Sequence, residues 1–196
     1  MKSTFLAVCF GLFAISAQAQ SPPFAARTAT FDAAVGFSYV SLPVTRHRTG
    51  LNGIDVSGTI GFSPAVAVRA DIGYVRASNV FSSTHHADLL SYLVGPVLYP
   101  IRTRRGAGYV QALAGGARET TPIIDNTGRM LFGGFANKFA WLAGGGVERR
   151  LSRSWRINLG IDYLHTAYFD ETRTVRGQSA VRVVARLVYS FETRER

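Results

Sequence analysis

The stretch that decides the fold is Val181-Arg182-Val183-Val184-Ala185-Arg186-Leu187-Val188-Tyr189-Ser190-Phe191. Every second residue from Val181 to Phe191 is apolar or aromatic, and the residues between them include Arg182, Arg186 and Ser190. Side chains of a strand alternate between its two faces, so one face here prefers hydrocarbon and the other carries guanidinium groups. Such a strand is unsuited to a sheet that is buried in a dry core on both faces.

The same alternation recurs along the chain in segments of about ten residues, as in transmembrane β-strands. The predicted strands are residues 30–42, 54–62, 66–76, 88–99, 109–117, 139–148, 155–165 and 181–191, of which 109–117 has no clear division into two faces. Connections after the second, fourth and sixth strands are short, whereas those after the first (43–53), third, fifth and seventh are longer. This pattern predicts an all-β fold, an eight-stranded antiparallel up-and-down transmembrane β-barrel with short periplasmic turns and long outer loops.

The N-terminus has the anatomy of a secretory signal peptide. Residues 1–19 combine Lys2, an apolar run and the small-x-small site Ala17-Gln18-Ala19, so the mature chain is expected to begin at Gln20. Residues 20–28 then form a periplasmic lead-in, residues 29–191 the barrel, and residues 192–196 a short periplasmic tail. The only cysteine, Cys9, leaves with the signal, so no disulfide is expected in the mature protein.

The composition is basic, with a formal net charge of +10 over 196 residues. A basic chain suggests nucleic-acid binding, but the export signal argues against that partner, and the arginines are spread over turns and one strand face. Outer-membrane lipids and the phosphates of lipopolysaccharide are the expected counter-charges.

The last strand ends in a row of outward residues, Ala185, Leu187, Tyr189 and Phe191, which looks like the C-terminal assembly signal of outer-membrane barrels. With this row and the alternating connections, the chain resembles the small eight-stranded outer-membrane barrels of the OmpA transmembrane domain, OmpX and opacity-protein type. The resemblance implies an outer-membrane location, monomers, and biogenesis through periplasmic chaperones and the barrel-assembly machinery. It also implies a structural, adhesive or poorly conducting role, with no catalytic residues and no cofactor.

Nine charged residues are expected on the inward faces of the predicted strands. They are Asp32, Asp55, Arg69, Asp71, Glu148, Arg156, Asp162, Arg182 and Arg186. The interior of an eight-stranded barrel is only wide enough for side chains to fill, so these charges should pair with one another. A turn centred on Ser152 would place Glu148 directly opposite Arg156. The set is either a structural plug, which we favour, or a gated path for ions and water.

Three functions follow from these patterns. The leading one is a structural or surface-interaction barrel, and the second is a narrow channel for ions or small solutes. The third is a lipid A-modifying enzyme, which we do not favour because His165 is followed by Thr166 and Ala167 instead of a His-x-Ser arrangement. No metal site is predicted either, since adjacent His85 and His86 would point to opposite sides of an extended chain.

Overall fold

The computed structural model describes residues 30–44, 47–78, 86–120, 122–124, 130–132, 136–169 and 175–191. The predicted signal peptide, the lead-in and the tail at 192–196 lie outside these residues and stay predictions. Among the described residues, no helix is long and apolar enough to cross a membrane.

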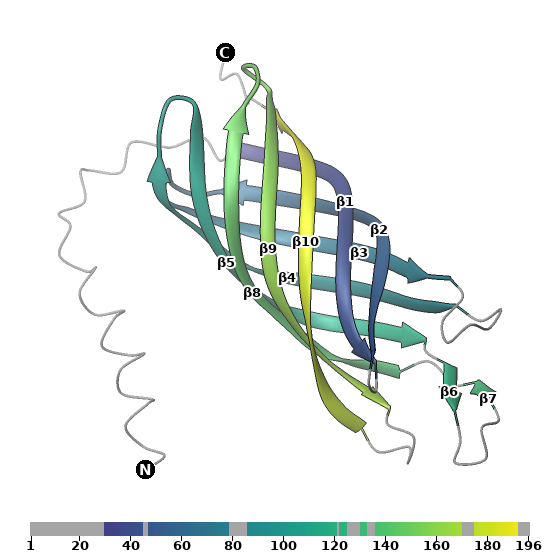
Figure 1. The fold of residues 1–196 in the computed structure, drawn as a ribbon. Coiled ribbons are helices and arrows are strands. Elements are labelled where there is room, and N and C mark those ends of the chain that lie inside the picture. The colour runs from purple at the N-terminus through teal and green to yellow at the C-terminus, as the bar shows by residue number, and fades with distance from the viewer. Residues whose placement is uncertain are drawn as a thin grey trace, which may run out of the picture.

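Ten strands make up the described structure (Figure 1). They are β1 (Thr30–Val44), β2 (His47–Gly61), β3 (Val66–Ala77), β4 (Ala87–Arg102), β5 (Gly106–Thr120), β6 (Pro122–Ile124), β7 (Met130–Phe132), β8 (Ala136–Arg150), β9 (Trp155–Phe169) and β10 (Val175–Phe191). Eight of them close into an antiparallel barrel in the order β1-β10-β9-β8-β5-β4-β3-β2, while β6 and β7 pair only with each other. The predicted fold class is therefore confirmed.

The strands are longer than predicted, mostly at the end where the longer connections lie. The clearest correction concerns residues 47–53, which were expected in an outer loop. They belong to β2, and Val44 pairs with His47, so only residues 45–46 separate β1 from β2. The hydropathy alternation marks the part of a strand that meets lipid, whereas backbone pairing continues wherever two strands remain side by side. The hairpin of β6 and β7 was not predicted either.

The two ends of the barrel are named here by their connections, although the predicted alternation of short and long connections fails after β1, whose connection of residues 45–46 is as short as the turns at the other end. Residues 62–65, 103–105 and 151–154 form tight turns at one end, here called the short-turn end, and the opposite end is called the loop end (Figure 1). Phe31 of β1 pairs with Phe191 of β10 near the short-turn end, so the first and last strands close the barrel directly.

Glycines occur where neighbouring strands approach very closely in the curved wall. A Cβ at Gly53 of β2 would overlap the carbonyl oxygen of Tyr74 and lie 2.7 Å from the Cα of Val75. Gly146 of β8 has the same relation to the carbonyl oxygen of Leu159 in β9. Both glycines lie in the inward rows, where bending of the wall crowds the backbone.

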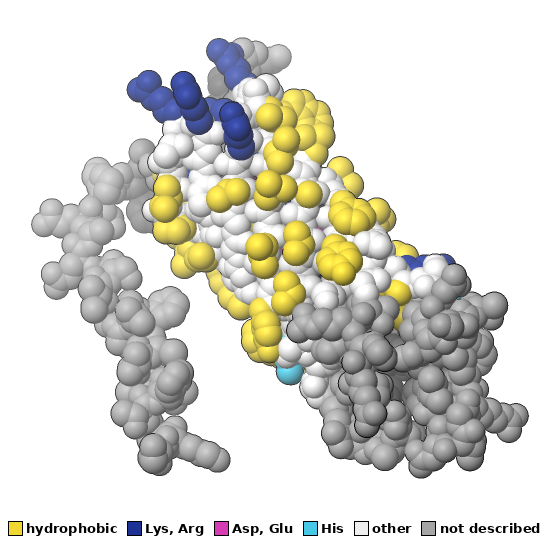
Figure 2. All heavy atoms as spheres, in the orientation of Figure 1, with side chains coloured by type: hydrophobic (Ala, Val, Ile, Leu, Met, Phe, Trp, Pro, Cys, Tyr) yellow, Lys and Arg dark blue, Asp and Glu magenta, His cyan; other side chains and the backbone are white. Residues whose placement is uncertain are grey.

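The outer wall of the barrel is apolar, as the yellow side chains of Figure 2 show on the visible face. Most of its aromatic residues lie toward the two ends, as expected for the interfaces of a membrane, although Phe37 and Tyr92 lie nearer the middle. The short-turn end carries Phe31, Phe62, Trp155, Tyr189 and Phe191, and the loop end carries Tyr39, Tyr74, Phe139, Trp141 and Tyr163. The period-two assignment of the outward face is confirmed on these strands.

An interior network of charges sealed by an apolar layer

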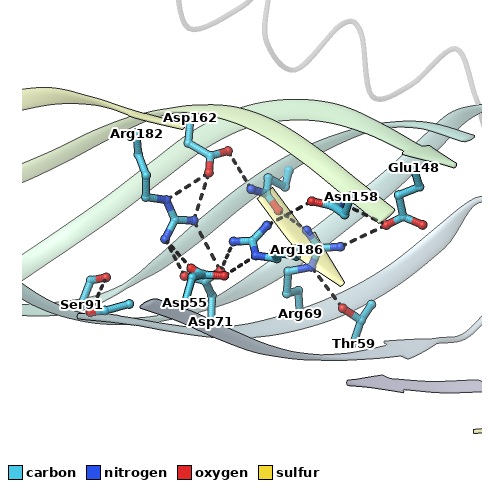
Figure 3. A network of polar contacts seen from close by, with 12 residues as sticks. Asp55, Thr59, Arg69, Asp71, Ser91, Glu148, Asn158, Asp162, Arg182 and Arg186 are labelled. Atoms are coloured by element: carbon cyan, nitrogen blue, oxygen red, sulfur yellow. Dashed lines mark hydrogen bonds and ion pairs between the residues drawn. The ribbon is translucent and has the colours of Figure 1, made fainter. Parts of the chain in front are cut away.

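Two arginines of the closing strand β10 hold the centre of the lumen (Figure 3). The Nη1 atom of Arg182 lies 2.7 Å from Oδ1 of Asp71 on β3 and 3.2 Å from Oδ2 of Asp55 on β2. Its Nη2 atom lies 3.0 Å from Oδ2 of Asp162 on β9. Arg186 binds the aspartates of β2 and β3, through Nε to Asp55 and through Nη2 to Asp71 at 2.7 Å. We call these five residues the central cluster.

The central cluster is almost completely shielded from solvent. The side chain of Arg182 is 2% exposed and that of Arg186 is 1% exposed, while the carboxylates of Asp55, Asp71 and Asp162 are 0% exposed. Two arginines face three aspartates, so the cluster carries a net charge of −1. Because unpaired buried charges are very costly, each of these groups depends on the others.

A second group of charges lies nearer the short-turn end. Nη2 of Arg69 is 3.5 Å from Oε1 of Glu148, and Nε of Arg156 is 3.4 Å from Oε2 of the same carboxylate. Arg156 also pairs with Asp32 through its Nη2 atom. Two arginines thus face two acidic residues, and this second group is electrically balanced.

Neutral side chains connect the two groups. Gln111 of β5 accepts a hydrogen bond from Nη1 of Arg69 at 2.8 Å and donates one from its own Nε2 to Asp162 at 2.7 Å. Asn158 donates from Nδ2 to Glu148 at 3.1 Å and accepts from the hydroxyl of Tyr109 at 3.1 Å. The sequence-based network left both out: Asn158 lies in a predicted inward row but carries no charge, and Gln111 lies in residues 109–117, whose faces were not assigned.

The structure thus brings all nine charged residues proposed from the sequence into one connected network. One detail of the expected pairing is wrong. Glu148 lies directly opposite Asn158, and Arg156 lies opposite Arg150, so the turn is centred one residue later than Ser152. The ion pair between Glu148 and Arg156 forms diagonally across β8 and β9, which long side chains allow.

A ring of buried apolar side chains fills the lumen on the loop-end side of the network. All eight barrel strands contribute to it. Its members are Val40, Leu51, Val75, Ala77, Ala87, Leu89, Leu93, Leu113, Ala117, Ala140, Leu142, Leu164 and Ala180, here called the apolar layer. Four strands carry both an apolar residue of this layer and a charge of the central cluster, namely β2, β3, β9 and β10. On each of them the apolar residue lies closer to the loop end than the aspartate or arginine of the cluster. Buried hydrocarbon therefore lies on one side of the charges.

The barrel is also filled toward the short-turn end. Tyr99 and Tyr109 pack there with Ala67 and Val97, and the guanidinium of Arg69 lies 5.0 Å from the centre of the Tyr109 ring. The sequence had given no clear faces for β5 because Tyr109 and Leu113 point inward while small alanines point outward. Because both faces of β5 carry apolar residues, hydropathy does not alternate from one residue to the next, and the two faces cannot be told apart from the sequence.

His165 lies on the outer wall near the loop end, in contact with residues that the sequence did not connect to it. Its Nδ1 atom is 3.0 Å from Oγ of Ser179 on β10, and Ser179 accepts a short hydrogen bond from the hydroxyl of Tyr163. The ring of His165 stacks on Trp141, with centroids 5.5 Å apart. Among the described residues no carboxylate forms an ion pair with His165.

The polar residues around His86, the second of the two adjacent histidines, bind one another. Asp88 lies 3.6 Å from Nε of Arg76 and 3.5 Å from Nε2 of His86, and it accepts a hydrogen bond from the Tyr74 hydroxyl at 3.0 Å. His85 lies outside the described residues. In the described part of the chain, no group of three or more His, Cys, Asp or Glu side chains is placed to hold a metal ion.

The four residues of the proposed assembly signal all lie on β10, with Ala185, Leu187 and Phe191 exposed on the outer wall. The Phe191 ring lies 4.7 Å from that of Tyr189 and 5.4 Å from that of Phe31, and Tyr189 lies 5.0 Å from Trp155. An aromatic row therefore crosses the seam between β9, β10 and β1.

No protein-family model matches the sequence, and no curated protein matches it. Solved structures do match. Neisserial surface protein A aligns with a TM-score of 0.62 at 14% identity, over 84% of this chain and 100% of that one. The attachment invasion locus protein Ail of Yersinia pestis aligns at 0.57 and 12%, over 84% and 100%. OprG of Pseudomonas aeruginosa aligns at 0.56 and 10%, over 85% and 98%. Together with the closed barrel of eight strands, these alignments show that the chain has the fold of the small outer-membrane β-barrels.

Proposed function

We propose that this protein is an integral outer-membrane protein whose sealed barrel anchors its outer loops for a structural or surface-interaction role. The apolar layer is the observation that carries the proposal, because all eight strands contribute to it and it crosses the lumen. Ions do not pass packed hydrocarbon without a large desolvation cost. The central cluster adds a second closure, since its charges are paired with each other instead of lining a water-filled path.

The location in the outer membrane is supported by the outer wall. It is apolar, has aromatic residues toward both ends, and belongs to strands of 12 to 17 residues. A membrane-spanning strand needs about 9–11 residues, so each strand is long enough to cross and to project beyond the bilayer. In this orientation the short-turn end faces the periplasm and the loop end faces outward. Outer-membrane lipids and lipopolysaccharide are the proposed partners, with periplasmic chaperones and the barrel-assembly machinery acting during biogenesis.

The structural neighbours are consistent with a surface role. One of them, Ail, has also been crystallised in complex with the heparin analogue sucrose octasulfate, an alignment with a TM-score of 0.53 at 13% identity. For the present chain we propose contact between the outer loops and anionic glycans such as lipopolysaccharide.

Single-channel recording in planar bilayers tests the sealed lumen. The refolded wild-type protein should show no discrete conductance steps. A variant that removes three large members of the apolar layer, Leu51→Gly, Leu89→Gly and Leu142→Gly, is the matched comparison, because it should admit water and raise the leak. Steady conductance through the wild type would refute the sealed barrel and would favour the narrow channel.

A further inference from the structure

Six arginines lie at the short-turn end, and all six are exposed: Arg102, Arg104, Arg105, Arg149, Arg150 and Arg153. They come from only two of the three tight turns and the strand ends beside them, because the turn Ser63-Pro64-Ala65 has no charge. Figure 2 shows the basic side chains gathered at this end, above the apolar wall. We call these six residues the arginine patch. We propose that it is a binding site for the phosphodiester headgroups of anionic phospholipids in the periplasmic leaflet.

The two turns are neighbours, so their arginines form one surface, contrary to the expectation from the sequence that the arginines are spread out. Strands β5 and β8 pair up to this end, with Gly106 opposite Arg149. The backbone amide of Arg150 donates a hydrogen bond to the carbonyl oxygen of Arg105 at 2.9 Å, which ties one turn to the other. The six positive charges therefore lie together on one part of the short-turn end.

Both turns are held by their own hydrogen bonds. The amide of Thr103 donates to the carbonyl oxygen of Gly106 at 2.8 Å, and the amide of Gly106 donates to the Thr103 hydroxyl at 3.1 Å. In the other turn, the amide of Leu151 donates to the carbonyl oxygen of Trp155 at 2.9 Å, and the amide of Trp155 donates to Oγ of Ser152 at 3.2 Å. A fixed backbone lowers the entropy that a ligand must remove when it binds.

The patch has a large excess of positive charge. Within the described residues, no carboxylate forms an ion pair with any of the six arginines. Arg150 lies directly opposite another arginine, Arg156, in the register of β8 and β9. Arg156 is already paired with Asp32 and Glu148, so the neighbouring strand supplies no counter-charge to Arg150.

The neighbouring apolar residues indicate a lipid as the source of that anion. Ile101 is 63% exposed, Leu151 is 56% exposed and Trp155 is 42% exposed, and all three lie within a few residues of the arginines in the sequence. Acyl chains can cover these side chains while phosphates meet the guanidinium groups, which bind phosphate oxygens in pairs. A glycan mesh such as peptidoglycan would supply carboxylates but would leave the three apolar side chains uncovered. The inference rests on the proposed membrane insertion.

The test measures lipid selectivity at the surface of the inserted barrel. Wild-type protein is reconstituted in phosphatidylcholine bilayers with spin-labelled phosphatidylglycerol or spin-labelled phosphatidylcholine, and the immobilised fraction of each label is compared. We expect a preference for phosphatidylglycerol on the order of three- to tenfold that weakens with salt. The triple variant Arg104→Gln, Arg105→Gln and Arg153→Gln should lose most of this preference, whereas the matched triple Arg→Lys variant at the same positions should keep most of it.

Equal selectivity in the wild type and the triple Gln variant would overturn the proposal. So would arginine-dependent co-sedimentation of the wild type with purified peptidoglycan combined with no lipid preference. Heat modifiability on unboiled gels shows separately whether each variant has formed a barrel in the membrane. A protein that inserts without lipid preference refutes the arginine site alone, whereas a wild type that does not insert refutes the proposed function.

Discussion

Replacing Arg182 by Gln should destabilise the barrel far more than replacing one of its aspartate partners. The central cluster holds two arginines and three aspartates. Arg182→Gln leaves one arginine facing three buried carboxylates, a net charge of −2, whereas Asp162→Asn leaves two arginines facing two carboxylates and a net charge of zero. Removing one member of a buried ion pair costs about 3–5 kcal/mol, and we expect Arg182→Gln in that range. Asp162→Asn keeps an acceptor for Arg182 and should cost about 1–3 kcal/mol.

The coupling between the two changes is the decisive quantity. Arg182 and Asp162 are joined by two hydrogen bonds, at 3.1 Å from Nε and 3.0 Å from Nη2. The double variant restores the net charge of −1, so its loss should be smaller than the sum of the single losses by about 1–3 kcal/mol. The measurement is reversible urea unfolding of the refolded protein in lipid bilayers or detergent, followed by tryptophan fluorescence.

The pair of Glu148 and Arg156 is the matched comparison within the same lumen. The side chain of Arg156 is 22% exposed, compared with 2% for Arg182, so water screens its interaction more strongly. Its double-variant cycle with Glu148→Gln and Arg156→Gln should give a coupling of about 1 kcal/mol or less. Additive losses in the cycle of Arg182 and Asp162 would show that water reaches the central cluster, and would refute the sealed lumen.

Three further predictions concern the aromatic row at the end of β10, a glycine in the barrel wall, and a serine near the loop end. Phe191→Ala should lower the amount of protein in outer-membrane fractions, because it removes the end of the aromatic row, whereas Ser190→Ala should not; equal immunoblot signals would contradict an assembly role. Gly53→Ala should cost about 1–3 kcal/mol in urea unfolding, because its Cβ would overlap backbone atoms. Gly58→Ala on the same strand should be tolerated, because its nearest contact would be a ring carbon at 3.7 Å, and equal losses would refute the steric argument. Ser179→Ala should leave the acylation of lipid A unchanged by mass spectrometry, and an altered pattern would indicate an enzyme.

The sequence was sufficient to predict the barrel because each lipid-crossing segment carries its own signal. In β10 and β3 the outward row is apolar and the inward row contains arginine or aspartate, so a period of two is visible within the strand itself. The ends of strands are less visible. Residues 47–53 of β2 continue the backbone ladder beyond the apolar alternation, and no side-chain pattern marks where that ladder stops.

The contents of the lumen could be predicted only in part. The period of two assigned nine charges to the inside, but it gave no height along the barrel axis and no partner across the lumen. Arg182 meets Asp71, which is 111 residues away and three strands distant around the wall. The register predicted for the neighbouring strands β8 and β9 was also wrong, because the turn at 151–154 is centred one residue later than the sequence analysis assumed. The layered arrangement of charges and hydrocarbon depends on register and shear, which emerge only when all strands are aligned.

The closing strand explains why these two layers can exist together in so narrow a barrel. Its outward row faces lipid, while its inward row carries Arg182 and Arg186, which contact β2 and β3. None of these contacts can form in a hairpin of consecutive strands, because β2 and β3 meet β10 only once the barrel has closed. The charges therefore stabilise the closed barrel in particular. The apolar layer lies beside them, and their own side chains are at most 2% exposed, so the loss of any one partner is more costly than at a solvated site.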